Sequence, residues 1–429
     1  MVYWTLLRDN ANYRNLWLGY VVTQLGDWFN LIATASLIEM LSGSGTAVSY
    51  LFLARFLPLF LFAPLAGVLA DRYDRRKIMI YSNLVQAAVV LGFLFVRHEA
   101  DLWLLYLLLV VQFALAALFT PARTAVIPNI VARRELVTAN ALDSLTWSTM
   151  LAVGALLGGI ATAVLGIQAA FILNAFAYAG STLLLARIAI VPRPLAPAGA
   201  ADTVSQPGGW FNFIDGLRYL RGERTILGLA LIKAGGSLAW GAINVLEVTF
   251  AHRVFPLAGG GEATLGLIYM ISGIGTGVGP LLLRRWLGDE PRKMRWAIII
   301  GLFLMTAGLF GLAVAPTFAW FSVATLVRTL GTGALWVFSA ALLQLAVPDK
   351  VRGRVFAFEF AVLTLTQSIS IYWAGYAMDQ INLTIEQTTL SMAFVGSFVT
   401  AVWLLFHWQT RHLMITAVAR NSDQFADND

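Results

Sequence analysis

Several ionisable residues stand inside long apolar segments of this chain, where a charge is costly and is therefore a candidate for function. Asp27 lies about twelve residues into the first apolar segment, roughly 18 Å at 1.5 Å per residue and near the centre of a bilayer. A carboxyl group at that depth can take up and release protons. Asp27 is therefore our first candidate for proton coupling or for binding a substrate cation, and a structural hydrogen bond to a neighbouring helix is the alternative.

Three more charged side chains are candidates for binding a proton or a substrate. Glu39 follows Asp27 on the same segment, about 120° further around a helix. Glu247 stands at a similar height in the seventh segment, so we expect both glutamates to face an outer vestibule, or else to be interfacial charges. Lys233 can pair with a carboxylate, bind an anionic substrate or extend its ammonium group to the inner interface. Other charged residues inside apolar segments are Arg55, Glu359, Asp143 and Arg328, the last two nearer the cytoplasmic ends of their segments.

Aromatic side chains are frequent in the same segments. We expect some of them to line a large apolar cavity that holds lipophilic or aromatic compounds. For each one singly, a position facing lipid or the interfacial belt is the alternative. The candidates for the cavity are Trp28, Trp240, Trp336 and Tyr372.

A dense run of charge, Gly67–Lys77, separates the second and third apolar segments. A loop this short and this basic between two membrane spans stays on the cytoplasmic side. Asp71 ends the second segment and is followed by four cations. Such an aspartate can make contacts that differ between two conformations, which is what a gate needs.

The composition indicates the kind of chain that must position these residues. Of 429 residues, 59% are hydrophobic and 12% are charged, and the mean hydropathy is +0.75. A soluble protein of this length could not cover its surface with so few charges. The sequence therefore predicts a polytopic membrane protein, and the net charge of +6, which lies in loops beside spans, does not indicate nucleic-acid binding.

The residue types also exclude several activities. Cys is absent, so disulfides and thiolate catalysis are excluded, and the four His are scattered. The sequence has no nucleotide-binding loop, metal-ligand cluster or nucleophile–base pair. We therefore expect no enzyme and no cofactor, and we expect a gradient rather than ATP as the energy source.

Twelve segments are long enough to cross a bilayer, which takes roughly 20 apolar residues per helix. With both termini cytoplasmic, the outer connections carry only Arg97 and Arg253 of the 29 Lys and Arg residues, apart from those inside spans. The segments are about 15–41, 47–70, 78–96, 102–132, 139–166, 168–191, 225–254, 263–287, 294–315, 317–347, 354–380 and 387–412.

The segments divide into two repeated halves. The exits of the fourth and tenth segments share a pattern of an apolar run, a short charged turn and a new helix. We predict a six-helix bundle at 1–191, a Pro-, Ala- and Gly-rich cytoplasmic linker at 192–223, a second bundle at 224–413 and a disordered tail at 414–429. Within the linker, 210–221 has one apolar face and predicts an amphipathic helix on the membrane surface, or else the start of the seventh span.

These residues resemble the major facilitator superfamily. The loop is similar to its signature G-x-L-a-D-r-x-G-r-k, with a departure at Asp74, where the pattern has Gly; the role of Asp74 is left open. Other segments, including Asn12–Gly19 and Pro121–Arg123, resemble the drug:proton antiporter group that includes macrolide-efflux and enterobactin-export proteins. Gly154–Gly159 is similar to the antiporter signature G-P-x-x-G-G but has Ala for Pro, and a helix-packing face is the alternative. The loop residues in register with the superfamily signature are Gly67, Leu69, Asp71, Arg72, Arg75 and Arg76.

The resemblance implies an all-α fold of twelve transmembrane helices in two pseudo-symmetric six-helix bundles, with a substrate site near mid-membrane. It implies that Asp71 meets the start of the eleventh span, near Arg352 and Arg354, when the cytoplasmic side is closed. We expect Arg123 to serve this gate.

The leading function is proton-driven export of an amphiphilic or lipophilic small molecule by alternating access. Lysophospholipid or other lipid transport is the alternative, and a non-transporting membrane receptor is a third. We expect a monomer in the bacterial cytoplasmic (inner) membrane, with a small molecule or lipid as substrate and membrane lipids as its surroundings.

Overall fold

The computed structural model describes residues 2–189, 218, 220–257, 260–288 and 290–410. In these ranges the chain is helical and has no β-strand, which confirms the predicted all-α class. The predicted linker at 192–223, apart from 218 and 220–223, lies outside the described residues. So do most of the amphipathic helix predicted at 210–221 and the tail at 414–429.

The predicted spans correspond to long helices, with ends that differ from the prediction by a few residues. Two spans contain one π-helical turn each, at Met150–Gly154 and Phe250–Val254. The helices of the first part are α1 (Val2–Asp9), α2 (Ala11–Ser42), α3 (Gly45–Arg72), α4 (Arg75–Gly92), α5 (Leu102–Ile130), α6 (Leu136–Thr149), α7 (Ala155–Leu165) and α8 (Ile167–Ala186). Those of the second part are α10 (Arg224–Trp240), α11 (Ile243–Thr249), α12 (Gly261–Leu287), α13 (Pro291–Ala313), α14 (Phe318–Ala346), α15 (Asp349–Asp379) and α16 (Ile385–Thr410).

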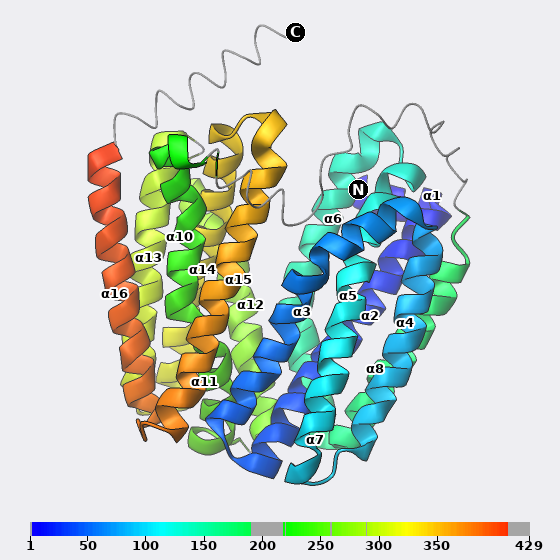
Figure 1. Ribbon diagram of the computed structural model, residues 1–429, viewed down its shortest axis with the longest axis horizontal. Coiled ribbons are helices and arrows are strands. Elements are labelled where there is room, and N and C mark those ends of the chain that lie inside the picture. The colour runs from blue at the N-terminus through cyan, green and yellow to red at the C-terminus, as the bar shows by residue number, and fades with distance from the viewer. Residues whose placement is uncertain (1, 190–217, 219, 258–259, 289, 411–429) are drawn as a thin grey trace, which may run out of the picture. The chain divides into compact units, whose positions relative to one another are not determined.

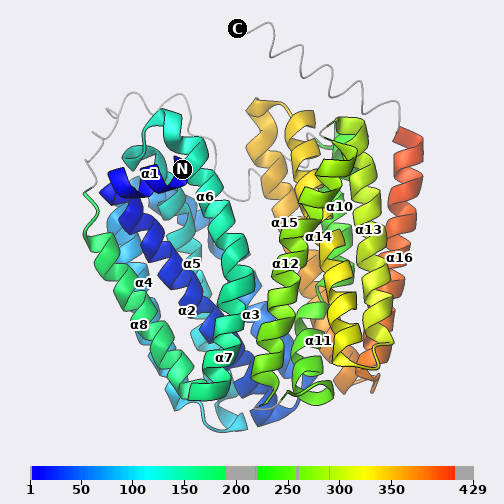
Figure 2. The ribbon, with the colours of Figure 1, turned by 180° about the vertical axis from the view of Figure 1, so that it is seen from behind.

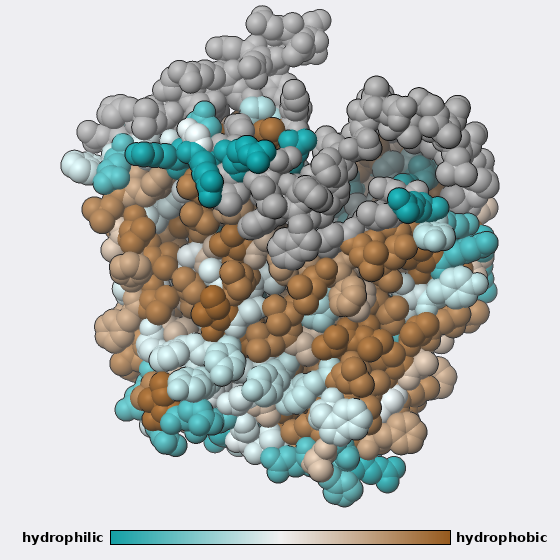
Figure 3. All heavy atoms as spheres, viewed as in Figure 1, coloured by the Kyte–Doolittle hydropathy of each residue, from teal (hydrophilic) through white to brown (hydrophobic). Residues whose placement is uncertain are grey.

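Eleven helical segments of the described chain are long and apolar enough to cross a membrane. The predicted first span, α2, is long enough but is more polar, because it carries Gln24, Asp27 and Asn30 in its middle. A helix satisfies its own backbone hydrogen bonds, which is what a span in lipid requires. Figure 3 shows apolar side chains over the middle of the helices and polar ones toward their ends.

Contacts divide the chain into two compact units. The first contains 1–42 and 54–211, and the second contains 43–53 and 212–429. The first turns of α3 therefore group with the second unit, whereas the rest of α3 groups with the first. In the first unit α2 packs against α8, and α4 packs against α5 and α8 (Figure 1).

Small residues allow the helices of the second unit to approach closely. There α13 packs against α14 and α16, which Figure 2 shows from behind. A Cβ atom at Gly301 would lie 2.8 Å from the carbonyl oxygen of Gly331, and one at Gly308 would lie 2.5 Å from the backbone nitrogen of Arg328. Helix association in lipid depends on such packing, since lipid tails are as apolar as the helices.

The structure gives a role to Asp74, which the sequence left open. Asp74 is the N-cap of α4, and its side chain accepts hydrogen bonds from the backbone N–H groups of Arg76 (2.9 Å) and Lys77 (3.2 Å). An N-cap carboxylate satisfies N–H groups that the helix itself leaves unpaired, and it is stabilised by the helix dipole. The Asp in place of the family's Gly therefore starts α4 at Arg75.

Candidate functional site

Asp27 is the end of a chain of hydrogen bonds in the first unit. The hydroxyl of Tyr178, on α8, donates to its Oδ1 at 2.6 Å. Gln112 Nε2, on α5, donates to the Tyr178 hydroxyl at 3.0 Å, and Asn30 Nδ2 donates to Gln112 Oε1 at 3.0 Å. Tyr178, Gln112 and Asn30 are buried, whereas Asp27 is partly exposed. The residue Asp27 is therefore less enclosed than the groups that hold it.

Close helix packing fixes this geometry. A Cβ atom at Gly26 would lie 2.7 Å from the Cβ of Ala177, so the glycine lets α2 approach α8 beside Tyr178. Arg55 of α3 acts electrostatically on Asp27, and its guanidinium lies 4.6 Å from the centre of the Phe113 ring. The alternative considered for Asp27, a hydrogen bond to a neighbouring helix, is thus present.

Arg123 is paired within the first unit. Its Nη2 lies 2.5 Å from Asp143 Oδ2 on α6, and its guanidinium lies 3.6 Å from the centre of the Tyr20 ring on α2. Arg123 is buried and joins three helices. This arrangement gives Arg123 a place in the packing of the unit, whatever part it has in a gate.

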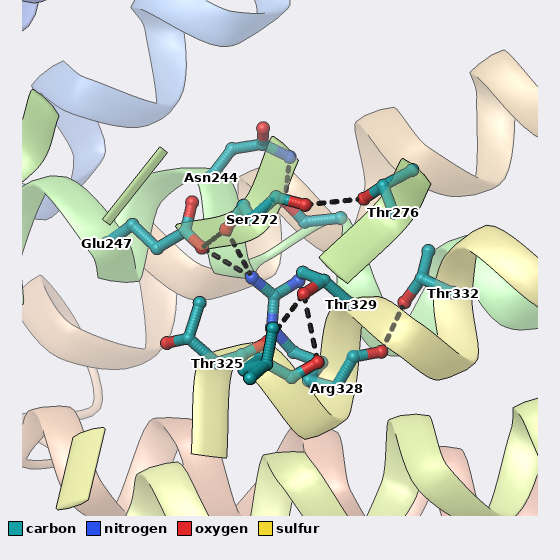
Figure 4. Close-up of polar contacts among 10 residues, drawn as sticks. Asn244, Glu247, Ser272, Thr276, Thr325, Arg328, Thr329 and Thr332 are labelled. Carbon is teal, nitrogen blue, oxygen red and sulfur yellow. Dashed lines mark hydrogen bonds and ion pairs between the residues drawn. The ribbon is translucent and has the colours of Figure 1, made fainter. Parts of the chain in front are cut away.

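A second ion pair lies in the other unit, and Figure 4 shows it. Arg328 Nη2, on α14, is 2.5 Å from Glu247 Oε1 on α11, and the hydroxyl of Ser272 on α12 lies 3.4 Å from both atoms. Arg328 and Glu247 are both buried. Glu247, expected at an outer vestibule or interface, is thus neutralised inside the bundle.

One prediction about this pair does not agree with the predicted topology. Arg328 was placed nearer the cytoplasmic end of its span, but α14 begins at Phe318, so Arg328 is only about 15 Å from the start of the helix. In the predicted topology that start is the outer end. Arg328 therefore lies at the level of Glu247, and the two charges compensate each other.

Lys233 pairs with a carboxylate, one of the three roles predicted for it. Its Nζ lies 3.0 Å from Glu359 Oε1 on α15 and 4.6 Å from the centre of the Trp336 ring on α14. Both charged side chains are only 5% exposed. Trp240 lies beside Trp336, with the ring centres 6.5 Å apart, and Trp336 is 44% exposed.

The other aromatic and acidic candidates are more scattered. Trp28 packs against the small-residue segment of the fifth span: a Cβ atom at Gly154 would lie 2.8 Å from its Cδ1 atom. Tyr372 is exposed and stacks on Tyr376 of α15, with ring centres 6.1 Å apart. Glu39 is buried on α2. The structure therefore brings together Lys233, Trp240 and Trp336 in the second unit, whereas Asp27 and Trp28 belong to the first unit.

The basic loop residues bind helix ends. Arg75 donates from Nη1 to the carbonyl of Ala125 at 2.8 Å, and Arg76 donates from Nε to the carbonyl of Leu185 at 3.2 Å and from Nη2 to that of Ala186. Cations are stabilised at the last carbonyls of a helix, here those of α8. The exposed Arg72 ends α3, and Arg352 Nη2 donates to the carbonyl of Val347 at 3.2 Å.

The predicted gate contact is that of Asp71 with the start of α15. Gly67 and Asp71 belong to α3, and Arg354 belongs to α15. The side-chain surroundings of Gly67 and Asp71 lie outside the described residues. The contact of Asp71 with the start of α15 therefore stays a prediction.

Sequence reasoning missed a contact at the opposite ends of the same two helices, inside the second unit. Asp379, the last residue of α15, accepts hydrogen bonds from the Ser44 hydroxyl (2.6 Å), the Gly45 N–H (3.1 Å) and the Thr46 N–H (2.8 Å). Gly375 lies one turn earlier, where a Cβ atom would be 2.6 Å from the Cα of Thr46. The Ser-Gly-Ser-Gly turn at the start of α3 indicates N–H groups that need a partner, but the sequence does not show that Asp379 is this partner.

We expect Asp379→Asn to weaken the attachment of α3 to α15. The amide can keep some of the bonds but loses the charge that favours the start of a helix, a cost of about 1–2 kcal/mol. Thermal unfolding in detergent, followed by the fluorescence of the 14 Trp residues, should show a lower midpoint. Asp9→Asn is the matched control, because Asp9 is an exposed aspartate at a helix end whose carboxylate accepts a hydrogen bond from its neighbour Arg8. An unchanged midpoint for Asp379→Asn would contradict the stabilising role.

Potential metal ligands do not cluster in the described part of the chain, where no group of three His, Asp or Glu could hold a metal ion. The charged side chains inside the helices include the ion pairs of Arg123, Lys233 and Arg328 and the hydrogen-bonded carboxyl group of Asp27. Helical spans whose internal charges are compensated are what a polytopic membrane protein needs.

The family model of the Major Facilitator Superfamily matches residues 16–371. The chain belongs to this superfamily. A solved variant of the nucleoside transporter NupG has the same fold, with a TM-score of 0.75 at 12% identity, covering 92% of this chain and 99% of that one.

Relatives of this superfamily member include efflux proteins. The macrolide efflux protein A of Streptococcus pyogenes is 24% identical over 376 residues, covering 86% of this chain and 89% of that protein. The uncharacterized MFS-type transporter YfiS of Bacillus subtilis is 24% identical over 412 residues, covering 89% and 90%. The major facilitator superfamily consists of transporters, so the predictions of a multi-pass membrane transporter and of no enzyme are confirmed.

Proposed function

We propose that this major facilitator protein exports amphiphilic or lipophilic small molecules from the bacterial cytoplasm in exchange for protons, and that Asp27 carries the proton. In this proposal both termini are cytoplasmic, the protein works as a monomer in the inner membrane, and alternating access moves the substrate. The gradient of protons supplies the energy.

The observation that carries the proposal is the environment of Asp27. Glu247 and Glu359 are buried, and each lies within 3.0 Å of a cation. Asp27 is bonded to a neutral phenol and is partly exposed. Each of these two glutamates can take up a proton only by giving up its contact with the cation. Asp27 differs from these carboxylates because the group hydrogen-bonded to it is a neutral phenol, while the guanidinium of Arg55 also acts on it electrostatically.

The substrate class rests on two supports. Relatives include a macrolide efflux protein, and macrolides are large amphiphilic molecules. In the second unit the exposed face of Trp336 stands beside Trp240, which offers an aromatic surface to a lipophilic ligand. Both features favour amphiphilic compounds over small hydrophilic solutes.

The test is transport by the purified full-length protein in proteoliposomes with an imposed pH gradient. The panel contains lipophilic cations, macrolides, siderophores and lysophospholipids. We expect accumulation of a macrolide or a lipophilic cation only when a gradient is present, with dissipation by a protonophore. Gradient-independent movement of lysophospholipid alone would favour the lipid-transport alternative and contradict proton-driven export.

We also propose that Asp71 holds the cytoplasmic side closed by binding the start of α15, because the first N–H groups of a helix favour a carboxylate. Asp71→Asn is then expected to shift the protein toward the inward-open state. The chain has no native Cys, so single cysteines introduced near Arg354 can report accessibility to a membrane-impermeant thiol reagent from the cytoplasmic side. We expect faster labelling in the variant, with Asp74→Asn as the control in the same loop. Equal labelling rates for Asp71→Asn and the parent would contradict this gate.

A further inference from the structure

The hydrogen bonds that end on Asp27 all run in one direction. Thr34 donates to Asn30 (3.4 Å), Asn30 to Gln112 (3.0 Å), Gln112 to Tyr178 (3.0 Å) and Tyr178 to Asp27 (2.6 Å). Each group uses its hydrogen toward the carboxylate. An ionised carboxylate can only accept, and it accepts more strongly than a protonated one, so this direction favours the ionised form of Asp27.

This chain of hydrogen bonds can rearrange in few ways, because its members are enclosed. Thr34, Asn30, Gln112 and Tyr178 are each at most 1% exposed and come from α2, α5 and α8. A phenol has one hydrogen, and Tyr178 accepts from Gln112 while it donates to Asp27. Tyr178 therefore cannot donate elsewhere without breaking the bond to the carboxylate.

Protonation of Asp27 at Oδ2 weakens this arrangement, because a neutral carboxyl oxygen is a weaker acceptor, and protonation at Oδ1 conflicts with it. If the acquired hydrogen of Asp27 points to the Tyr178 oxygen, Tyr178 must donate to Gln112, and the Gln112 amide must turn its oxygen toward the phenol. Asn30 must then turn as well, because Gln112 would present its NH₂ group to the Asn30 donor. No covalent bond is made or broken apart from the O–H bond of the incoming proton.

We propose that Tyr178 and Gln112 are positioning residues that favour the ionised form of Asp27 in this conformation, and that proton binding weakens or reverses this chain of hydrogen bonds. This inference rests on the proposed function, in which Asp27 binds the coupling proton. Proton binding would therefore affect three helices at once, because the amides that turn lie between α2, α5 and α8. Charge-assisted hydrogen bonds are the stronger ones, and chains of them reinforce one another.

Other groups around Asp27 affect its charge, and they are the same in every variant of the test. They are the Arg55 guanidinium on α3 and the Tyr20 phenol on α2, in addition to Tyr178. None of the variants used below alters Arg55 or Tyr20. A change in the titration of Asp27 would therefore come from the altered hydrogen-bond chain.

The experiment follows the infrared band of the protonated carboxyl group as a function of pH in the full-length protein, with Asp27→Asn supplying the background. We expect Tyr178→Phe to move the midpoint of the Asp27 band upward by about one pH unit or more, since the lost bond favoured the ionised form. Gln112→Met should move it in the same direction by less. Tyr13→Phe is the matched control, because Tyr13 is equally buried and donates to a backbone carbonyl, that of Ala139, at 2.9 Å.

The outcomes separate this inference from the proposed function. A midpoint in Tyr178→Phe and Gln112→Met equal to that in Tyr13→Phe would overturn the positioning role, even if Asp27→Asn abolishes proton-driven transport. If the midpoints shift but gradient-driven transport survives in Asp27→Asn, the hydrogen-bond chain still controls the titration of Asp27. In that case Asp27 has no part in proton coupling. If Tyr178→Phe does not fold, Gln112→Met alone decides between these results.

Discussion

Asp27→Asn is expected to abolish proton-driven transport while leaving the carrier able to bind and exchange substrate. Asn fills nearly the same volume and can still accept the hydrogen bond of Tyr178, so the packing of α2 against α8 should survive. It cannot take up or release a proton. Accumulation driven by an imposed pH gradient should fall to the level of liposomes without protein.

Two measurements distinguish this loss from misfolding. Exchange of labelled for unlabelled substrate at equal pH on both sides does not need net proton movement, and we expect it to continue in Asp27→Asn. Asp27→Glu keeps a titratable group and should retain part of the gradient-driven uptake. Full gradient-driven uptake by Asp27→Asn would remove Asp27 from the mechanism, whereas loss of exchange together with uptake would indicate a binding or structural role.

Much of the fold was predictable from hydropathy and charge. The spans, their ends and the family follow from apolar length and from the loop residues around Asp71, because lipid forces every spanning segment to satisfy its own backbone. The depth of Asp27 along α2 was likewise predictable, because a helix has a fixed rise per residue. Its partners were not, since Tyr178 is far away in sequence and depends on how α2 and α8 are rotated.

The partners within the ion pairs were also not predictable from the sequence. Lys233 and Glu359, or Glu247 and Arg328, are recognisable as charges inside spans, but their pairing depends on which helices are neighbours and on which face is turned inward. Counting residues along one helix gives depth, and for Arg328 the count from Phe318, the outer end in the predicted topology, disagrees with its placement nearer the cytoplasmic end. The role of Asp74 is a milder case: an N-cap signal directly before α4 was present in the sequence and was passed over in favour of the family pattern.

Breaking the pair of Lys233 and Glu359 is expected to destabilise the second unit strongly, and removing both charges is expected to restore most of the loss. Glu359→Gln leaves the ammonium of Lys233 buried without its counter-charge, and Lys233→Met leaves the carboxylate in the same position. A buried charge that loses its partner costs about 3–5 kcal/mol, whereas replacing both by neutral groups of similar size is often neutral. The thermal midpoints of the two single variants should therefore fall well below that of the double variant Lys233→Met with Glu359→Gln.

Transport by the double variant then decides what the pair is for. If it is stable and transports normally, the charges only compensate each other inside the bundle. If it is stable but inactive, the pair takes part in the transport cycle, and the position of Lys233 over Trp336 is where a substrate would compete with the ammonium group. A double variant no more stable than either single variant would show that the 3.0 Å contact is not the interaction that holds α10 to α15. Phe310→Leu is the control for a general loss of packing in the same unit, because its ring contacts Phe394 with centres 5.7 Å apart and has no charge to compensate.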